Sequence, residues 1–366
     1  MKIVDVKTEN YAWPRPRPIT NGKHTYSNVR LAMVKIETDE GITGIGLGEA
    51  IGNDHDIFKA IAEYLKPQLI GEDPINVERL WHKMWVPKLV GRRGLTTRVI
   101  SAIDIGLWDL KGKVTGIPLY KLLGGYRDSV PAYIAGGYYE EGKGLKELQD
   151  EMLQYVSWGA RAVKMKVGAL SLHEDAKRVK AVREAVGPEI KILLDANCAY
   201  RYYDAVRFAR LVEEYDPFWF EEPVAAEDYE GLAKLAAKTS IPLATGENEY
   251  TRYGFRDLIA QKAVPILNAD PKILGGFTEF MKVAALAQAH DLDIAPHGLQ
   301  DVNIHVVPAI ANGLLLEYYP VQLDPMWEKV YNYTLKLSSD GTVSPPDLPG
   351  LGVEPNYEEL AKYRIG

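Results

Sequence analysis

The sequence predicts an α/β protein in which a closed barrel of parallel strands follows a separate α+β domain. From about residue 130 onward, eight short apolar runs rich in Val, Ile, Leu and Ala alternate with longer stretches of helical periodicity. Such alternation is typical of parallel strands with crossover helices, and eight units close into a barrel. Polar residues gather at the ends of these runs, whereas residues 1–125 lack the alternation.

The barrel domain is predicted over residues 126–325. A charged amphipathic segment at 174–186 is typical of its helices. Because the carboxyl ends of all strands in such a barrel meet at one mouth, the residues that close the apolar runs are expected to share one site. The strands are expected at residues 131–136, 162–167, 192–197, 219–223, 242–248, 266–271, 293–297 and 313–319.

Residues 1–125 are predicted to form the α+β domain. The C-terminal tail, residues 326–366, has a proline-rich turn and a helix candidate at 357–363. We expect the tail to supply no strand to the barrel and to return to the first domain. The elements expected in the first domain are an N-terminal strand, a hairpin of strands at 29–38 and 43–47 with its turn at 39–41, and helices near 57–69, 77–85 and 97–113.

Length, composition and charge exclude several classes of function. The chain has 366 residues, 46% of them hydrophobic, which is enough for a large core. No apolar segment approaches the roughly 20 residues of a membrane span, and the N-terminus is charged where a signal peptide is apolar, so we expect a cytoplasmic protein. The single cysteine, Cys198, excludes an internal disulfide and a thiolate-rich zinc site. A net charge of −7 without a long basic run argues against nucleic acid, so the expected partner is a small molecule.

Three acidic residues close successive apolar runs at equal spacing. Asp195, Glu221 and Glu247 are each separated by 26 residues, the period of one strand plus one helix. A buried carboxylate is costly unless it is compensated, so three at matched positions indicate a shared cation. Oxygen ligands suit Mg²⁺, whereas zinc would favour His or Cys. A helix cap or a salt bridge would explain any one of these acids equally well, but not all three.

Lys164 and Lys166 lie two positions apart on one predicted strand and therefore share a face. We place both inside the barrel, because two lysines on the helix-facing side would be costly in an apolar layer. Near a divalent cation the charged form of lysine is disfavoured, and the neutral amine can act as a base.

Three further residues end strands on the other side of the predicted barrel. Asp270 and His297 end neighbouring strands, and an aspartate bonded to one ring nitrogen orients a histidine and raises its basicity. Alone, His297 is equally well explained as a buried histidine with satisfied hydrogen bonds. Glu317 ends the last strand, where we expect burial to raise its pKa and make it a proton donor to an oxyanion; a cap or an arginine partner is the alternative. Lysine and histidine bases beside a metal ion fit abstraction of the proton α to a carboxylate.

This ordered set resembles the enolase superfamily, and within it the mandelate racemase subgroup, over essentially the full length of the chain. The resemblance implies a modified TIM barrel, (β/α)7β, whose mouth is capped by the first domain and whose eighth helix is replaced by the tail. It also implies Mg²⁺ as the cofactor and a homo-oligomer. The roles it implies are proton transfer by Lys166 and His297, contact with the substrate carboxylate by Lys164, metal binding by Asp195, Glu221 and Glu247, orientation of His297 by Asp270, and electrophilic assistance by Glu317.

Two departures from relatives narrow the predicted substrate. Muconate-lactonizing enzymes have a lysine at the position of Asp270, and Lys272 lies two residues away, so a cycloisomerase of that subgroup is disfavoured. The residues around His297 differ from those of mandelate racemase itself. Members that resemble this chain mostly dehydrate sugar acids to 2-keto-3-deoxy acids: a base removes the α-proton, and His297 would then help the β-hydroxyl to leave.

Substrate contacts are expected from two cap loops and one strand end. The polar, basic segments 13–18 and 20–26 suit a lid over a polyhydroxy acid or diacid, although a solvated proline-rich loop explains them equally well. The candidate substrate residues are Arg15, Arg17, His24, Asn53 and Asn197, with Lys23 and Ile51 as further choices.

Two alternative functions remain open. Racemisation or epimerisation needs the same catalytic residues as dehydration, because only the presence of a β-leaving group on the substrate decides between the two reactions. A barrel that binds a sugar acid without turnover is a third possibility.

Overall fold

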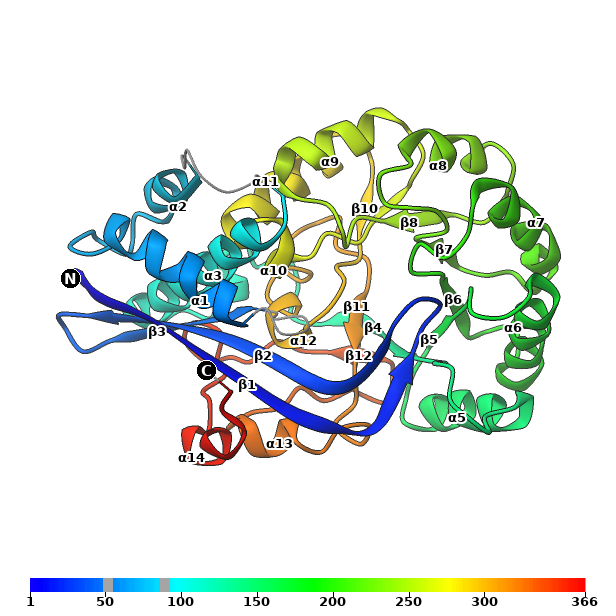
Figure 1. Ribbon diagram of the computed structural model, residues 1–366, viewed down its shortest axis with the longest axis horizontal. Coiled ribbons are helices and arrows are strands. Elements are labelled where there is room, and N and C mark those ends of the chain that lie inside the picture. The colour runs from blue at the N-terminus through cyan, green and yellow to red at the C-terminus, as the bar shows by residue number, and fades with distance from the viewer. Residues whose placement is uncertain (49–54, 86–92, 366) are drawn as a thin grey trace.

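Two sheets organise the chain in the computed structural model, which describes residues 1–48, 55–85 and 93–365. A three-stranded antiparallel sheet with the order β1-β2-β3 belongs to the first domain, and a larger parallel sheet forms the barrel. Figure 1 shows the β1–β2 ribbon, in dark blue, running from the helices of the first domain across to the barrel strands. The predicted fold class, an α/β barrel with an α+β capping domain, is confirmed.

The β1–β2 ribbon is longer than the sequence indicated. β1 (Ile3–Thr20) pairs with β2 (Thr25–Thr38), so residues 13–18 lie in a strand, and the expectation of a loop there is wrong. β1 is an edge strand of this sheet, where a proline without an N–H group breaks no second ladder. The pairing register also shifts between Pro14 and Ile19, which accommodates the proline-rich segment.

The rest of the capping domain follows the prediction. A hairpin joins β2 to β3 (Thr43–Gly48), and the helices are α1 (His55–Leu65), α2 (Val77–Trp85) and α3 (Leu95–Thr115), with the short η1 (Lys66–Gln68) after α1. α3 approaches β3 so closely that a Cβ at position 46 would lie 1.8 Å from the carbonyl oxygen of Ala102. Glycine is therefore required at position 46, and the apolar core of the domain forms around this contact.

All eight predicted barrel strands are confirmed, most of them shorter than their apolar runs. They pair in parallel in the order β10-β9-β8-β7-β6-β5-β4-β11. Backbone bonds from Ile294 N to Asn312 O (2.8 Å) and from Leu314 N to Ile294 O (2.7 Å) join the two ends of the sheet and close the ring. The strands are β4 (Val130–Gly136), β5 (Ala162–Lys166), β6 (Lys191–Asp195), β7 (Trp219–Glu221), β8 (Leu243–Thr245), β9 (Ile266–Leu267), β10 (Asp293–Ile294) and β11 (Leu316–Tyr318).

Helices cover the outside of the barrel, as Figure 1 shows for α5 to α9. α6 begins with a capping box, in which the Ser171 hydroxyl accepts from Glu174 N (3.3 Å) and Glu174 Oε2 accepts from Ser171 N (3.1 Å). Among the described residues, no helix is both long and apolar enough to cross a membrane. The helices before and around the barrel are α4 (Leu119–Leu122), α5 (Leu145–Ser157), α6 (Leu172–Val186), α7 (Tyr202–Val212), η2 (Glu213–Tyr215), α8 (Tyr229–Ala236), α9 (Thr251–Ala260), α10 (Pro271–Leu274), α11 (Gly276–Gln288) and α12 (Gln300–Asn303).

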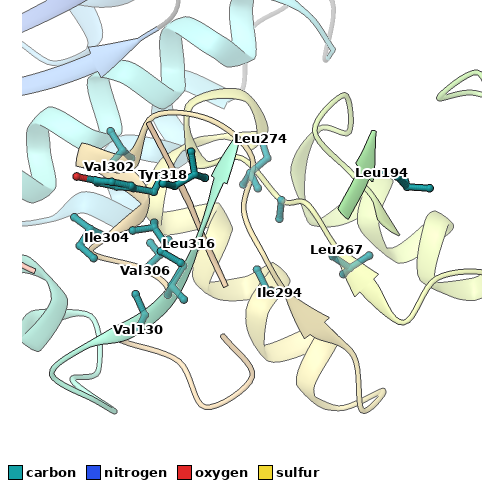
Figure 2. Packing of buried hydrophobic residues seen from close by; sticks show 14 of the residues in the cluster. Val130, Leu194, Leu267, Leu274, Ile294, Val302, Ile304, Val306, Leu316 and Tyr318 are labelled. Carbon is teal, nitrogen blue, oxygen red and sulfur yellow. The ribbon is translucent and has the colours of Figure 1, made fainter. Parts of the chain in front are cut away.

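Side chains alternate between the two faces of each barrel strand. The inward faces form an interior cluster that includes Tyr133, Leu193 and Trp219, and the outward faces pack against the surrounding helices and loops. Figure 2 shows part of the outer cluster, where Leu316 of β11 lies beside Val306 from the segment after α12. The same alternation decides which polar side chains point into the barrel.

The C-terminal tail contributes a strand, so the expectation that it leaves none is wrong. β12 (Thr342–Val343) pairs antiparallel with Val130 and Pro131, because β11 covers β4 only from Ala132 onward. The tail then returns to the capping domain through α13 (Trp327–Val330), α14 (Tyr357–Leu360) and η3 (Ala361–Tyr363). Asp109 of α3 joins the parts, accepting from Leu351 N and from Ile45 N at 2.8 Å each. The domain boundaries near 125 and 325 stay a prediction.

His305 links the barrel to the tail and makes stability sensitive to acid. Its Nε2 lies 3.0 Å from the carbonyl oxygen of Leu351, its side chain is fully buried, and burial lowers its pKa to about 3. Below about pH 6.5, the ordinary pKa of histidine, the unfolded chain binds a proton that the folded chain does not. His305 therefore makes its full contribution to the free energy of unfolding above this pH, and this contribution is lost as the pH falls toward 3.

Between pH 7 and pH 5, His305 is expected to lower the free energy of unfolding by about 2 kcal/mol. Urea denaturation of the wild type and of His305→Gln at both pH values checks this, because glutamine keeps a donor toward Leu351 but does not titrate. The wild type should lose about 2 kcal/mol more than the variant. An equal loss in the two proteins would contradict the assignment.

Candidate active site

The strand register brings three candidate site residues side by side. Lys166 pairs with Asp195 across β5 and β6, and Asp195 pairs with Glu221 across β6 and β7. Paired residues on neighbouring strands point to the same face, which here is the barrel interior. Glu247 follows β8 after a turn at Gly246, whose φ of 134° suits glycine. Four candidate residues thus converge at the carboxyl ends of four successive strands.

Lys164 lies at the centre of the site and is completely buried. Its Nζ is 3.2 Å from both carboxylate oxygens of Glu221, 2.8 Å from Glu317 Oε1 and 3.5 Å from Asp195 Oδ2. Burial disfavours the charged amine, but the carboxylates outweigh it and raise the pKa of Lys164 well above its ordinary value. Lys164 is therefore held as an ammonium ion.

Lys166 lies one inward position nearer to the mouth and also meets a carboxylate. Its Nζ forms a short ion pair with Asp195 Oδ2 and lies 5.3 Å from the centre of the Tyr138 ring. Burial opposes the charge, but Asp195 outweighs it and the pKa of Lys166 is raised. The expectation of a neutral lysine beside a divalent cation stays a prediction; in the present arrangement the aspartate pairs with the amine.

The three carboxylates supply an all-oxygen donor set. Asp195 and Glu221 are completely buried, and Glu247 Oε2 is buried without a hydrogen-bond partner among residues 1–48, 55–85 and 93–365. Within the part of the chain that the structure describes, no three acidic, histidine or cysteine side chains enclose an ion position as they stand. Lys164 explains this, because its ammonium group contacts both Asp195 and Glu221. The donor chemistry fits Mg²⁺, provided that this ammonium group moves away from the carboxylates.

Crowding gives the three acids different pKa values. Burial opposes ionisation of Asp195, but Lys166 and Lys164 outweigh it and lower its pKa to about 2. Burial raises the pKa of Glu221 to about 8, with Asp195 and Glu247 acting in the same direction and Lys164 against them. The pKa of Glu247 is raised by burial as well. So many buried acids are costly unless positive charge shares the site, which is the physical argument for a cation.

The structure brings His297 and Asp270 into contact. His297 Nδ1 lies 3.1 Å from Asp270 Oδ2, and His297 Nε2 lies 3.6 Å from Glu247 Oε2. Burial opposes the charged ring, but Glu247 and Asp270 outweigh it and raise the pKa of His297 well above its ordinary value. The ring is therefore oriented by Asp270 on one nitrogen and directs the other toward the carboxylates.

Glu317 is held by three donors from different parts of the site. Its Oε1 accepts from Lys164 Nζ (2.8 Å) and from Tyr319 OH (3.2 Å), and its Oε2 accepts from Gly298 N (2.7 Å). Burial favours the neutral acid, but Lys164 and His297 outweigh it and lower the pKa of Glu317 to about 2. The expectation that burial would raise this pKa is wrong for this arrangement, because Lys164 lies in direct contact.

A cavity of about 2290 Å³ opens between the barrel mouth and the β1–β2 ribbon. Arg15 Nε and Asn197 Oδ1 are buried at its wall and have no hydrogen-bond partner in the part of the chain that the structure describes, so both can bind a polar ligand. Ile51 and Asn53, the remaining candidate substrate residues, lie outside the described residues. The candidate residues that line the cavity are Lys166, Asn197, Glu247 and His297 from the barrel, and Arg15, Arg17, Lys23 and His24 from the ribbon.

Sequence reasoning missed a group of tyrosines around the two lysines. Tyr133 OH lies 3.4 Å from Lys164 Nζ, and Tyr138 OH lies 3.4 Å from Tyr319 OH, which in turn donates to Glu317. Tyr133 and Tyr319 occupy inward positions of the same alternation that places the lysines. That alternation was the signal that could have found them.

Glu222 was also missed, although it directly follows a candidate metal ligand. It is only 2% exposed, accepts from Asn248 Nδ2 at 2.8 Å, and lines the cavity. Burial raises its pKa well above the ordinary value. Consecutive strand residues normally face opposite sides, but the backbone turns at Glu222, with a φ of 40°, and this turn was not visible in the sequence.

Comparisons with known proteins agree with this geometry. Residues 3–124 match the family model described as mandelate racemase / muconate lactonizing enzyme, N-terminal domain, and residues 147–360 match the one described as enolase C-terminal domain-like. An arabinonate dehydratase from Saccharolobus solfataricus is 37% identical over 330 residues, 88% of each chain. A 3,6-anhydro-alpha-L-galactonate cycloisomerase from Streptomyces coelicolor is 34% identical over 367 residues, 100% of each chain. The crystal structure of a racemase from Streptomyces coelicolor with bound magnesium has a TM-score of 0.93 at 32% identity, covering 99% of this chain and 100% of that chain.

Proposed function

Because the chain belongs to the mandelate racemase and muconate lactonizing enzyme family of the enolase superfamily, we propose that it dehydrates a sugar acid to a 2-keto-3-deoxy acid. One observation carries this proposal: Lys166 and His297 reach the same mouth from well-separated strands, with three carboxylates between them. On one side of the ring β4 and β11 separate the two bases, and on the other side β6 to β9 do.

The proposed cofactor is Mg²⁺, held by Asp195, Glu221 and Glu247. When bound, the ion would stabilise negative charge on the carboxylate oxygens of the substrate. Two features support the fit: the donors are all oxygens, and no described residue forms a hydrogen bond to Glu247 Oε2. Lys164 Nζ and Glu317 Oε1 lie 2.8 Å apart beside these donors. The pair would contact the substrate's carboxylate once Lys164 has moved away from Asp195 and Glu221.

The proposed reaction uses one base and one acid. Only the neutral amine is a base, so Lys166 first releases its own proton to solvent and separates from Asp195. Its Nζ then takes the proton from the α-carbon, and the electrons of the broken C–H bond form the enediolate. The β C–O bond then breaks as His297 Nε2 gives its proton to the departing hydroxyl, which leaves as water. The resulting enol takes up a proton at the β-carbon and becomes the 2-keto-3-deoxy acid. Asp270 keeps the imidazole in place throughout.

The cavity supports a polyhydroxylated substrate. Its volume accommodates a chain of several hydroxylated carbons, and Arg15 and Asn197 present at its wall buried polar atoms that no other described residue hydrogen-bonds. An arginine at the cavity wall suits a second carboxylate or a hydroxyl group. A small-molecule acid is therefore the proposed partner. By resemblance to the family alone, the proposal includes a cytoplasmic homo-oligomer.

Racemisation or epimerisation of an α-hydroxy acid is the second candidate function. The observation in its favour is the presence of bases at two sides of the mouth, since a two-way proton transfer needs one on each face of the substrate. The similar racemase structure from Streptomyces coelicolor is consistent with this reading. The cycloisomerase relative is named for neither dehydration nor racemisation. Cyclised sugar acids should therefore be included in the substrate screen.

Incubation with Mg²⁺ and a library of sugar acids and α-hydroxy acids in deuterated water, followed by NMR, tests the proposal. A deoxy product with deuterium at the β-carbon is expected. Deuterium at the α-carbon of an acid that keeps all its hydroxyl groups would show that the reaction is epimerisation and not dehydration. Stabilisation by Mg²⁺ with no change in any acid would instead favour a barrel that binds without turnover.

A further inference from the structure

Behind the end of β5, α6 carries a buried arginine that bonds to the backbone of two barrel strands. Arg178 Nη1 donates to the carbonyl oxygen of Lys166 (2.7 Å), and Nη2 donates to the carbonyl oxygen of Gly137 (2.8 Å). The side chain is only 9% exposed. One rigid guanidinium group therefore ties the end of the strand that bears the proposed base to the end of the neighbouring strand.

Asp175 extends this contact to the loop after β5. It is completely buried, and its Oδ1 accepts from Arg178 Nη1 (3.1 Å) and from Tyr139 OH (2.7 Å). Its Oδ2 accepts from Gly168 N (2.8 Å), two residues beyond Lys166. The Arg178 guanidinium also lies 4.0 Å from the centre of the Tyr139 ring. Acid, arginine and tyrosine thus form one buried unit.

The same unit holds the tip of the cap ribbon. Tyr139 N donates to the carbonyl oxygen of Thr20 (2.9 Å), forming an antiparallel bridge between the barrel and β1. Gly22, in the turn of the ribbon, lies so close that a Cβ there would be 3.0 Å from Ala199 Cβ and 3.2 Å from the carbonyl carbon of Gly168. The tip therefore sits directly on the loops that follow β5 and β6.

We infer that Arg178 is a positioning residue for Lys166. Asp175 and Tyr139 join Arg178 to the cap, so that docking of the cap tip on the barrel and orientation of the Lys166 side chain are coupled. The inference rests on the proposed function, in which Lys166 is a base. Arg178 touches no reacting atom and acts through the peptide group of Lys166. A displacement of about 1 Å at a reacting group can cost about 10²-fold in rate.

A second arginine on the same helix offers a matched control. Arg183 is also tied to backbone carbonyls, but at the end of α6 away from the mouth. Its bonds, at 2.7–3.0 Å, go to the carbonyl oxygens of Tyr215, Gly187, Ile190 and Asp216. Loss of this side chain removes a comparable set of hydrogen bonds without touching the strand end that bears Lys166.

The test compares Arg178→Lys, Tyr139→Phe and Arg183→Met by α-proton exchange in deuterated water. Lysine keeps the charge beside Asp175 but cannot span two carbonyls. In a pair of acids epimeric at the α-carbon, one presents its proton to Lys166 and the other to His297. Arg178→Lys is expected to slow the first exchange by about 10²-fold and the second by less than about threefold. Tyr139→Phe removes the hydroxyl bonded to Asp175, so it is expected both to raise KM about three- to tenfold and to slow the exchange that faces Lys166.

Hydrogen exchange measured by mass spectrometry supplies a readout that is independent of catalysis. Arg178→Lys is expected to accelerate amide exchange in residues 166–170 and 20–24 together, and Arg183→Met in neither segment. Equal slowing of both α-proton exchanges, or amide exchange that rises in only one of the two segments, would overturn the inference. A wild type that exchanges no acid at all would refute the proposed function, and the amide comparison would still decide whether cap tip and strand end are coupled.

Discussion

Replacing His297 by asparagine is expected to abolish dehydration, lowering kcat by about 10²–10⁴-fold, the usual contribution of a general acid or base. Asparagine can still donate a hydrogen bond to Asp270, which lies 3.1 Å from His297 Nδ1, so the wall of the cavity is kept. It cannot give a proton to a departing hydroxyl. Exchange of an α-proton that faces Lys166 should therefore continue, and NMR in deuterated water measures turnover and exchange in one sample.

The control for this variant is His290→Asn, which changes the same residue type at an exposed position after α11. It should have wild-type activity. Full turnover in His297→Asn would show that the acid is another group. Loss of exchange from both faces of the substrate would show that His297 shapes the site instead of donating a proton.

Removal of the divalent cation is expected to lower the rate of dehydration to a similar extent as His297→Asn. A Lewis acid contributes several kcal/mol of transition-state stabilisation, so chelation should lower the rate by about 10³-fold or more. Mg²⁺ at about 100 times its Kd should raise the free energy of unfolding by about 2.7 kcal/mol. Thermal melting with and without Mg²⁺ measures the second effect in the absence of substrate.

Glu247→Gln is the sharpest variant for this test. Asp195 and Glu221 both contact lysines, so changing either would also release an ammonium group. Among the described residues, Glu247 has only the 3.6 Å contact with His297, and its Oε2 has no hydrogen-bond partner. The variant should lose most of the stabilisation by Mg²⁺, whereas Glu189→Gln on the surface should keep it. Unchanged stabilisation in Glu247→Gln would remove this residue from the proposed ligand set.

Much of this site was predictable because strand ends in a parallel barrel converge whatever lies between them. The equal spacing of Asp195, Glu221 and Glu247 placed them on successive strands, and the observed register of β6 and β7 sets the first two side by side. Lys164 and Lys166 needed only the alternation of a strand. These are local or periodic properties, which a sequence displays directly.

Other features depended on contacts that no local pattern shows. The proline-rich segment of β1 was expected to be a loop, because proline disfavours a sheet interior; its edge position removes that objection. The two residues of β12 are too short to show periodicity, and they form a strand only because the start of β4 is left uncovered by β11. Arg178 looked like one charge among several on an amphipathic helix until its partners, the carbonyls of two strand ends, were in view.

The sequence by itself determined the order of the elements, the fold class and the residues that close the barrel strands, because hydrophobic periodicity and β/α spacing are written along the chain. Only the tertiary structure decided the charge states and the links between cap and barrel. Glu317 ionises because Lys164, from a strand distant in sequence, lies 2.8 Å away, and Lys166 is charged because Asp195 contacts it. A pKa depends on the nearest charges in space, and those neighbours exist only after the ring of strands has closed.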